Sequence, residues 1–152
     1  MSERLTIKRL KKHIGKEVCL SGWFEITQDR INDFAKGTED KQWIHINIKK
    51  AKASPLGGTV AHGFLVLSLI PYLSQKSKIL SYDYKMMVNY GVNKVRFINS
   101  VSSGSRIRNR AVLVKVEKKG FHRILATIQN TVEIEGQDKP ALVAEALVLF
   151  YV

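Results

Sequence analysis

The sequence has little cysteine and no long apolar run, and each shortage excludes a class of protein. The single cysteine, Cys19, cannot form an intramolecular disulfide, which fits a reducing compartment. Its apolar neighbours, Val18 and Leu20, favour a buried structural thiol over a reactive one. The longest apolar stretch, residues 63–73, is too short to span a bilayer, and the basic N-terminus lacks the apolar core of a signal peptide. We therefore expect a cytoplasmic protein without membrane contact.

Acidic residues are also scarce. The chain has 13 Asp and Glu against 25 Lys and Arg, which gives a net charge of +12. Such an excess concentrates anionic partners around the protein. Nucleic acid, phosphorylated cofactors such as coenzyme A, and an acidic carrier protein all fit this charge, and charge alone does not choose among them.

There are no internal repeats, no low-complexity tract and no linker. The 152 residues suit one domain, so we expect residues 1–152 to form a single unit. The composition, 45% hydrophobic and 25% charged, is ordinary for a globular protein. Residues 5–14 predict a short amphipathic helix before this unit's first strand.

The first half of the chain predicts a strand, a helix and a loop. Residues 17–26 are rich in apolar and aromatic side chains, as in a strand. Thr27 is a suitable N-cap for a short helix through Lys36, with Gly37 as its stop. Residues 37–47 are polar and are expected to be irregular.

Residues 59–73 form the most informative segment for the architecture. Their apolar side chains fall on almost every side of a helix, so such a helix must be buried all round. The second half offers strands that could wrap it, in an antiparallel meander with short turns. The expected strands lie in residues 84–100, 105–117, 121–135 and 140–151. A long curved antiparallel sheet around one buried helix is an α+β arrangement, the hot-dog fold.

Asp40 and His45 are the first candidates for chemistry. A carboxylate and an imidazole five residues apart on a loop can be turned toward one water molecule and shuttle its protons. Taken alone, the residues favour a surface aspartate and a partly buried histidine beside Trp43 over a catalytic pair.

The segment that precedes the apolar helix is the second candidate. Unpaired N–H groups point out of a helix N-terminus, so the N–H of Gly63 could stabilise an oxyanion. The same glycines also suit a simple turn into a helix, and His62 suits a capping or core position.

Several ordered motifs resemble the MaoC-like dehydratase family, which includes the (R)-specific enoyl-CoA hydratases, and most closely its nodulation-protein-N-like branch. The resemblance covers roughly residues 22–151. The matching motifs are Phe34-Ala35, Thr38-x-Asp40 followed by His45, Ala-x2-Ser-Pro-x-Gly-Gly, Ala61-His62-Gly63-Phe64, Asn89-Tyr90-Gly91-x-Asn93-Lys94-Val95-Arg96-Phe97, and Gly104-Ser105-x-Ile107.

The resemblance implies a hydratase/dehydratase that interconverts 2-enoyl and 3-hydroxyacyl thioesters of coenzyme A or acyl carrier protein. Asp40 would be the main base, and His45 would hold the water and assist proton transfer. The Gly63 N–H would polarise the thioester carbonyl. No metal or other cofactor is expected, because the thioester itself acidifies the C2 proton, and coenzyme A would enter only as part of the substrate.

One departure from the family pattern concerns the substrate. Many family hydratases carry Asn two residues after the aspartate and Pro next, where this chain has Gln42 and Trp43. Gln42 could still bind the thioester, Trp43 could fill part of the acyl pocket, and His62 could also contact substrate. The change puts the identity of the substrate in question more than the type of reaction.

Two sets of residues in the predicted strands have open roles. Tyr90 and Asn93 could form a wall of the substrate tunnel, with Lys94 and Arg96 as cations for the cofactor's phosphates, or all four could lie on a solvated strand face. The arginines at 106, 108 and 110 alternate along one strand, which favours a solvated outer face over a phosphate-binding patch.

Three other functions remain open. An acyl-CoA thioesterase on the same fold often uses a carboxylate on the central helix, and residues 63–73 contain none. A nucleic-acid-binding module fits the charge, but no nucleic-acid motif is present. A non-catalytic acyl-CoA-binding protein is the third. The family resemblance also implies a homodimer, with a trimer of dimers as a higher assembly.

Overall fold

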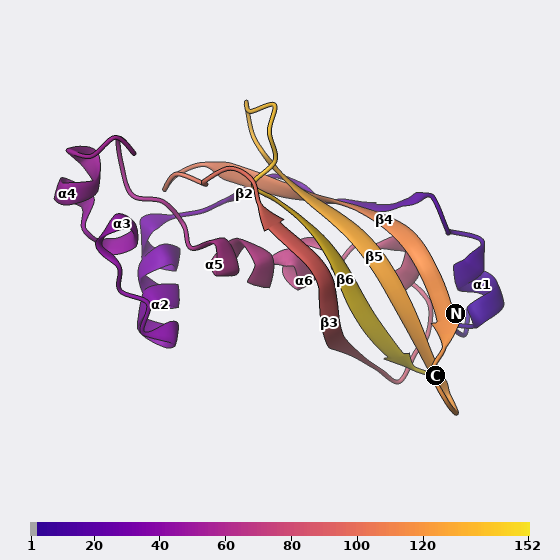
Figure 1. The fold of residues 1–152 in the computed structure, drawn as a ribbon. Coiled ribbons are helices and arrows are strands. Elements are labelled where there is room, and N and C mark those ends of the chain that lie inside the picture. Colours follow the sequence, from indigo (N-terminus) through magenta and orange to yellow (C-terminus); the bar gives the residue numbers. More distant parts are fainter. Residues whose placement is uncertain (1–2) are drawn as a thin grey trace.

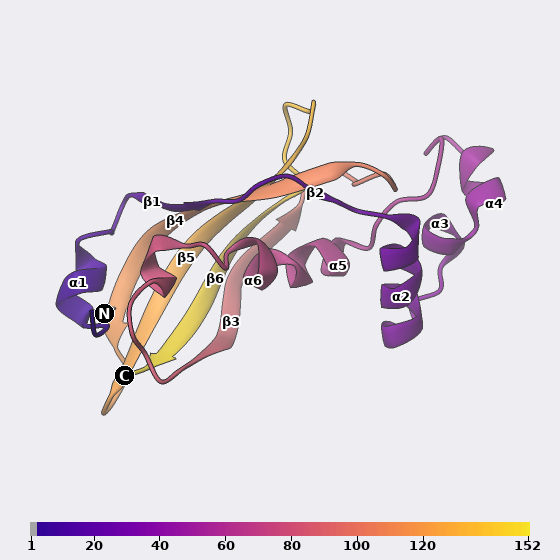
Figure 2. The same cartoon turned by 180° about the vertical axis from the view of Figure 1, so that it is seen from behind.

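The structure is a computed structural model that describes residues 3–152, and its main element is one curved antiparallel sheet with two short helices in its hollow (Figures 1 and 2). The strands are β1 (Glu17–Leu20), β2 (Phe24–Glu25), β3 (Met86–Phe97), β4 (Arg106–Lys118), β5 (Arg123–Ile134) and β6 (Leu142–Tyr151). The helices are α1 (Ile7–Lys11), α2 (Gln28–Thr38), α3 (Trp43–Ile46), α4 (Ile48–Lys52), α5 (Gly63–Ser68), α6 (Ile70–Leu73) and the single 3₁₀ turn η1 (Lys78–Leu80).

The sheet order is β1-β4-β5-β6-β3, with β2 also paired to β4. Strands β4, β5 and β6 follow one another as an antiparallel meander, as the sequence predicts. Strand β3 comes earlier in the chain but pairs with β6, so it forms one edge of the sheet. In β4 the buried side chains alternate from Ile107 to Leu113, and the buried position moves by one residue to Val116 beyond a bulge.

The main core lies between α5–α6 and the concave face of the sheet. Leu65 and Val66 of α5 and Ile70 of α6 pack in one cluster with residues of β4, β5 and β6, among them Ile107 and Leu142. This arrangement confirms the predicted α+β hot-dog architecture, a long curved sheet around a central helix. The segment from α2 to α4 extends beyond the end of the sheet, on the side where α5 begins (Figures 1 and 2).

The central helix departs from its prediction in two respects. Residues 59–62 are not helical, and the helix begins at Gly63 and breaks after Ser68. Pro71 accounts for the break, because it has no N–H for the intrahelical bond to the preceding turn. Nor is the helix buried all round, since Phe64 is 65% exposed and Tyr72 is 50% exposed. The sheet therefore wraps only part of it.

Three boundaries in the first half were also predicted wrongly. The strand expected over residues 17–26 is divided into β1 and β2, and between them Ser21 bonds to the backbone of Asn109. The helix capped by Thr27 passes through Gly37 and ends at Thr38. The loop expected over residues 37–47 contains the helical turn α3.

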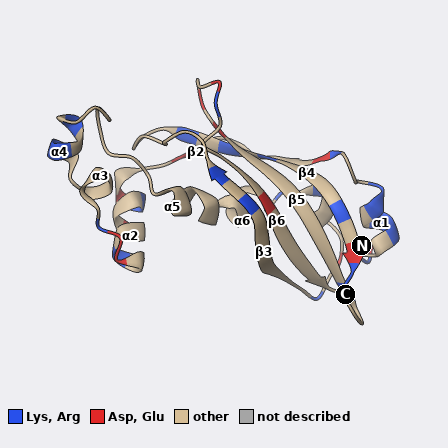
Figure 3. Ribbon diagram, viewed as in Figure 1, with Lys and Arg blue, Asp and Glu red and all other residues tan. Residues whose placement is uncertain are grey.

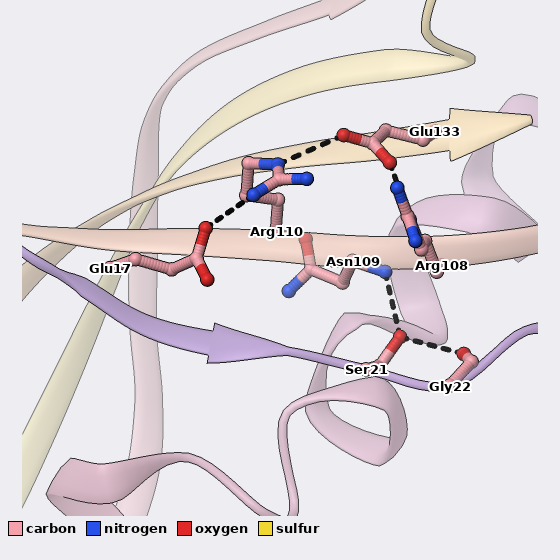
Figure 4. A network of polar contacts seen from close by, with 7 residues as sticks. All are labelled: Glu17, Ser21, Gly22, Arg108, Asn109, Arg110 and Glu133. Atoms are coloured by element: carbon pink, nitrogen blue, oxygen red, sulfur yellow. Dashed lines mark hydrogen bonds and ion pairs between the residues drawn. The ribbon is translucent and has the colours of Figure 1, made fainter.

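Three arginines of β4 on the outer face of the sheet form ion pairs with glutamates. Glu133 lies between Arg108 and Arg110, and Arg110 also pairs with Glu17 (Figure 4). Burial raises the pKa of the Glu133 carboxyl, but hydrogen bonds and charges from both arginines outweigh it, so the pKa lies below its ordinary value. Arg106 pairs in the same way with Glu135. The arginines thus lie on the outer face, as predicted, and their ion pairs disfavour a phosphate-binding patch.

Cys19 is buried, with its Sγ 3.6 Å from the carbonyl oxygen of Leu73, as expected of a structural thiol. Burial, and then the charge of Glu17, raise the pKa of this thiol. Within residues 3–152, no helix has the length and apolarity needed to cross a membrane.

Candidate active site

Asp40 is presented by the turn that ends α2. Glu39 adopts a left-handed backbone with φ of 62° and terminates the helix, and Asp40 follows it. The Asp40 N–H lies 3.4 Å from the hydroxyl of Thr38, a long hydrogen bond. The carboxylate side chain is 53% exposed. It is therefore accessible to solvent at the edge of the site.

His45 is held more firmly, in the middle of α3. Its Nδ1 lies 2.6 Å from the carbonyl oxygen of Val60, and its ring is buried. A carbonyl oxygen only accepts hydrogen bonds, so Nδ1 carries the proton and Nε2 keeps its lone pair in the neutral ring. Gln28 supports this turn from α2 by donating to the His45 carbonyl at 2.8 Å. Nε2 is thus available to a water or substrate.

His62 lies against both of these residues. Its ring stacks on that of His45, with centroids 3.7 Å apart and planes inclined by 22°. Its Nε2 lies 2.9 Å from the carbonyl oxygen of Asp40 and 4.0 Å from the carboxylate Oδ2 of the same residue. Phe34 contacts the ring too, at 4.9 Å between centroids. The structure therefore brings three sequence-predicted residues together.

The same three residues are the group that could hold a metal ion. One donor atom from each of Asp40, His45 and His62 lies within 4.8 Å of the others. However, the two imidazoles are stacked nearly parallel, so their ring-plane lone pairs do not converge on one point as a tetrahedral metal requires. His62 Nε2 is also occupied by the Asp40 carbonyl. The donor set therefore fits a resident metal poorly.

Gly63 begins α5 beside His62, and its N–H has no acceptor within the helix. A Cβ at this position would lie 2.8 Å from Cδ1 of Phe97, so no side chain fits without moving that ring. Gly63 and His45 line the same cavity of about 360 Å³. Phe64 and Phe97 form part of its apolar wall. An imidazole and a backbone donor thus face one partly apolar space.

Comparison with known proteins assigns the chain to a family. Residues 9–136 match the MaoC like domain. The chain is 46% identical over 136 residues to 3-hydroxyacyl-thioester dehydratase Z of Mycobacterium tuberculosis, covering 90% of this chain and 89% of that protein. The chain belongs to the MaoC-like family. It is a hydratase/dehydratase, that is, a hydro-lyase.

One further relative and two solved structures are also similar to this chain. Nodulation protein N of Rhizobium leguminosarum is 39% identical over 141 residues, which cover 92% of this MaoC-like chain and 88% of that protein. The (R)-hydratase from A. caviae shares the fold with a TM-score of 0.73 at 19% identity, over 89% of this chain and 94% of that one. A monoamine oxidase regulatory protein from Archaeoglobus gives a TM-score of 0.83 at 23% identity, over 97% and 95% of the two chains. The resemblance to the family and to its nodulation-protein-N branch is confirmed.

The other predicted substrate residues do not line the cavity of this MaoC-like protein. Gln42 is exposed, and the Trp43 ring packs under the ammonium group of Lys50, 4.6 Å away. Tyr90 lines a separate cavity of about 460 Å³, between α6 and the sheet. Asn93 instead donates to Glu145 at 2.6 Å. Their binding roles stay predictions that the cavity around His45 does not support.

Lys94 and Arg96 are also remote from this cavity. Val95 packs against the core cluster and Phe97 against Gly63, so these two face α5. Successive side chains of a strand point to opposite faces, which puts Lys94 and Arg96 on the outer face. The fold therefore does not bring the two predicted phosphate-binding cations to Asp40 and His45.

The contacts that hold the site in place could not be predicted from the sequence. The Val60 carbonyl, the Gln28 amide and the Phe34 ring fix His45 and His62 through contacts between distant segments. Phe34 and Phe97 were visible only as parts of family motifs. A backbone carbonyl carries no sequence signal at all.

Proposed function

We propose that this enzyme interconverts 2-enoyl and 3-hydroxyacyl thioesters, with Asp40 and His45 as its acid–base pair. The observation that supports this most is the state of His45. Its Nδ1–H is bonded to the Val60 carbonyl, which leaves Nε2 without a partner within the described residues. A nitrogen of the ring lies within 4.8 Å of an Asp40 carboxylate oxygen, and His45 lines the same cavity as Gly63. An acid–base pair and an oxyanion donor are the groups that hydration of an enoyl thioester requires.

In the hydration direction, a water molecule donates hydrogen bonds to Asp40 and to His45 Nε2. Its oxygen forms a bond to C3 while Asp40 takes one of its protons. The electron pair of the C2–C3 double bond moves toward the carbonyl oxygen, and the Gly63 N–H stabilises the resulting enolate. The pair then delivers the proton to C2, which restores the carbonyl and the starting state of both residues. Dehydration is the reverse, and no redox step or metal is needed.

We propose that the acyl group is carried as a thioester of coenzyme A or of acyl carrier protein. We also propose that the enzyme acts in the cytoplasm. α5 and α6 contain no carboxylate, so nothing in the central helix favours the thioesterase alternative. Arg106, Arg108 and Arg110 of β4 are paired with glutamates, which weakens the case for nucleic acid. Figure 3 shows the remaining basic residues spread over separate elements, including α1 and α4.

We also propose that two copies associate through the edge of the sheet. Strand β3 pairs on one side only, and an unpaired edge is a template for another strand. Val92 and Phe97 on this strand are about half exposed, as is Ile98 just beyond it, and Phe64 of α5 is more exposed still. A second copy would cover this apolar surface and finish the wrapping of the central helix. Sedimentation equilibrium tests the dimer, and a monomer at micromolar concentration would contradict it.

The activity is tested by following hydration of crotonyl-CoA and longer 2-enoyl-CoAs spectrophotometrically. Loss of a positioned acid–base group should lower kcat by roughly 10²–10⁴-fold in Asp40→Asn and His45→Ala. Asp33→Asn, which changes an exposed carboxylate on the same α2 segment, is the matched control and should keep wild-type kcat. Wild-type protein without turnover on any CoA or carrier-protein thioester would overturn the proposal. Activity in both variants equal to that of wild type would overturn the residue assignment.

A further inference from the structure

His62 is the most deeply buried polar residue of the site, and it has no access to the cavity. Its ring is 2% exposed, and the cavity that His45 and Gly63 line does not include it. A group that cannot touch the substrate cannot exchange a proton with it. Any contribution of His62 to the reaction must therefore pass through its neighbours.

One of these neighbours is the backbone that presents Asp40. The Asp40 carbonyl accepts from His62 at 2.9 Å, across 22 residues of sequence. Among residues 3–152, this is the one hydrogen bond that reaches residues 39–41 from outside residues 38–42. The left-handed turn at Glu39 would otherwise be free to rotate the carboxylate away from the ring of His45. His62 thus holds in place the backbone that carries the Asp40 carboxylate.

The other neighbour is the catalytic imidazole. His45 is stacked on His62 at 3.7 Å between ring centroids, while its own Nδ1 is fixed by Val60. A hydrogen bond at one nitrogen leaves the ring free to pivot about that bond, and a flat partner underneath prevents the pivot. One residue therefore sets the position of both members of the pair.

We propose that His62 is a positioning residue that holds Asp40 and His45 in register for the reaction. The inference rests on the proposed function and adds a residue to it. The Asp40 carbonyl can only accept, so Nε2 of His62 carries the proton. Its Nδ1 is buried and has no hydrogen-bond partner within the described chain. All of the anchoring hydrogen bonding therefore passes through Nε2.

Because only Nε2 of His62 has a partner, substitutions can separate its hydrogen bond from its ring contact. The amide nitrogen of glutamine reaches about where Nε2 lies, whereas that of asparagine reaches only the Nδ1 position, where no partner exists. Phenylalanine keeps a flat ring against His45 but has no donor. Misplacing a catalytic group by about 1 Å costs about 10²-fold in rate. We expect kcat for enoyl-thioester hydration to fall about 10²-fold in His62→Asn and His62→Phe, and His62→Gln to recover it to within about tenfold of wild type.

Two further readouts separate positioning from a merely structural role. KM should change little in all three variants, because the ring does not line the cavity. The pH limits of kcat should match those of wild type in His62→Gln, because Asp40 and His45 still carry the protons. His13→Gln is the control, since His13 makes a similar bond, 3.0 Å from Nε2 to the Tyr82 hydroxyl, away from the site. It should keep wild-type kcat.

Thermal melts of each variant give the folded fraction, and kcat is expressed per folded molecule. Equal kcat for the Gln and Asn variants overturns the proposal, as does a loss confined to KM or to the melting temperature. A shifted pH limit in His62→Gln overturns it too, because His62 would then titrate in the reaction. Wild-type protein without turnover would instead contradict the proposed function itself.

Discussion

Replacing Gly63 with alanine tests whether the position of the Gly63 N–H, the proposed oxyanion donor, depends on its contact with Phe97 in the cavity wall. An alanine Cβ would lie 2.8 Å from Cδ1 and 2.9 Å from Cε1 of Phe97. Ordinary contact begins at 3.4 Å, so the ring or the start of α5 must move by about 0.6 Å. Phe97 is half exposed on the edge strand, and its ring packs edge-to-face against that of Phe64, with 5.5 Å between the centroids. The ring can therefore move outward, but only by disturbing that contact.

The cost of this movement can be bounded. Overpacking of a core position costs about 1–3 kcal/mol, and the exposed ring places this site at the lower end. Alanine in place of glycine recovers about 0.4–1 kcal/mol by restricting the unfolded chain. We expect Gly63→Ala to lose about 0.5 kcal/mol of unfolding free energy, which urea denaturation measures. The helix start takes up part of this movement and displaces the Gly63 N–H by less than about 1 Å, so kcat should fall about tenfold.

A second substitution checks that the contact with Phe97 is the cause. Phe97→Ala opens the space that the new methyl group needs. The double variant Gly63→Ala with Phe97→Ala should therefore show a coupling of about 0.5–3 kcal/mol in unfolding free energy, in the sense of mutual relief. Wild-type kcat in Gly63→Ala, or strict additivity of the two changes, would refute the reasoning.

Three further predictions concern stability and reactivity. Glu133→Gln should lower the free energy of unfolding by roughly 1 kcal/mol near neutral pH. Because the pKa of Glu133 is depressed in the folded state, this difference in unfolding free energy should persist above the ordinary glutamate pKa and vanish as the pH falls through the folded-state pKa. Urea melts at several pH values measure it. Phe150→Ala should lose about 3–5 kcal/mol in urea melts, since this side chain is fully buried among residues such as Leu113 and Ile124, and a loss below about 1 kcal/mol would contradict this. Cys19 should resist a thiol reagent in the folded protein, because burial raises the pKa of its thiol, and rapid native-state labelling would contradict this.

The fold was predictable where the pattern is local. The meander of β4, β5 and β6 follows from long alternating strands and from turns such as the one at Gly120. The break in the central helix was not predicted, because its apolar content concealed the effect of Pro71. Bulges in β3 between Asn89 and Gly91, and between Val92 and Lys94, decide which side chains face the helix, and no alternation rule could have located them.

The site was predictable only in part. Asp40, His45 and Gly63 were identified because they occur in ordered motifs, and the structure brings them to one place. The roles of Tyr90, Asn93, Lys94 and Arg96 in substrate binding remain predictions without support from the cavity. The anchoring contacts of His62 could not have been predicted, because they join α5's start to the end of α2 through a backbone carbonyl.

The most direct test of the central claim is to run the reaction in water labelled with heavy oxygen. Wild-type enzyme and a 2-enoyl thioester should give a 3-hydroxyacyl thioester whose label lies on C3, as mass spectrometry of the intact product will show. Asp40→Asn and His45→Ala should incorporate it roughly 10²–10⁴-fold more slowly. Label in a released carboxylate instead of on C3 would identify a thioesterase and contradict the account.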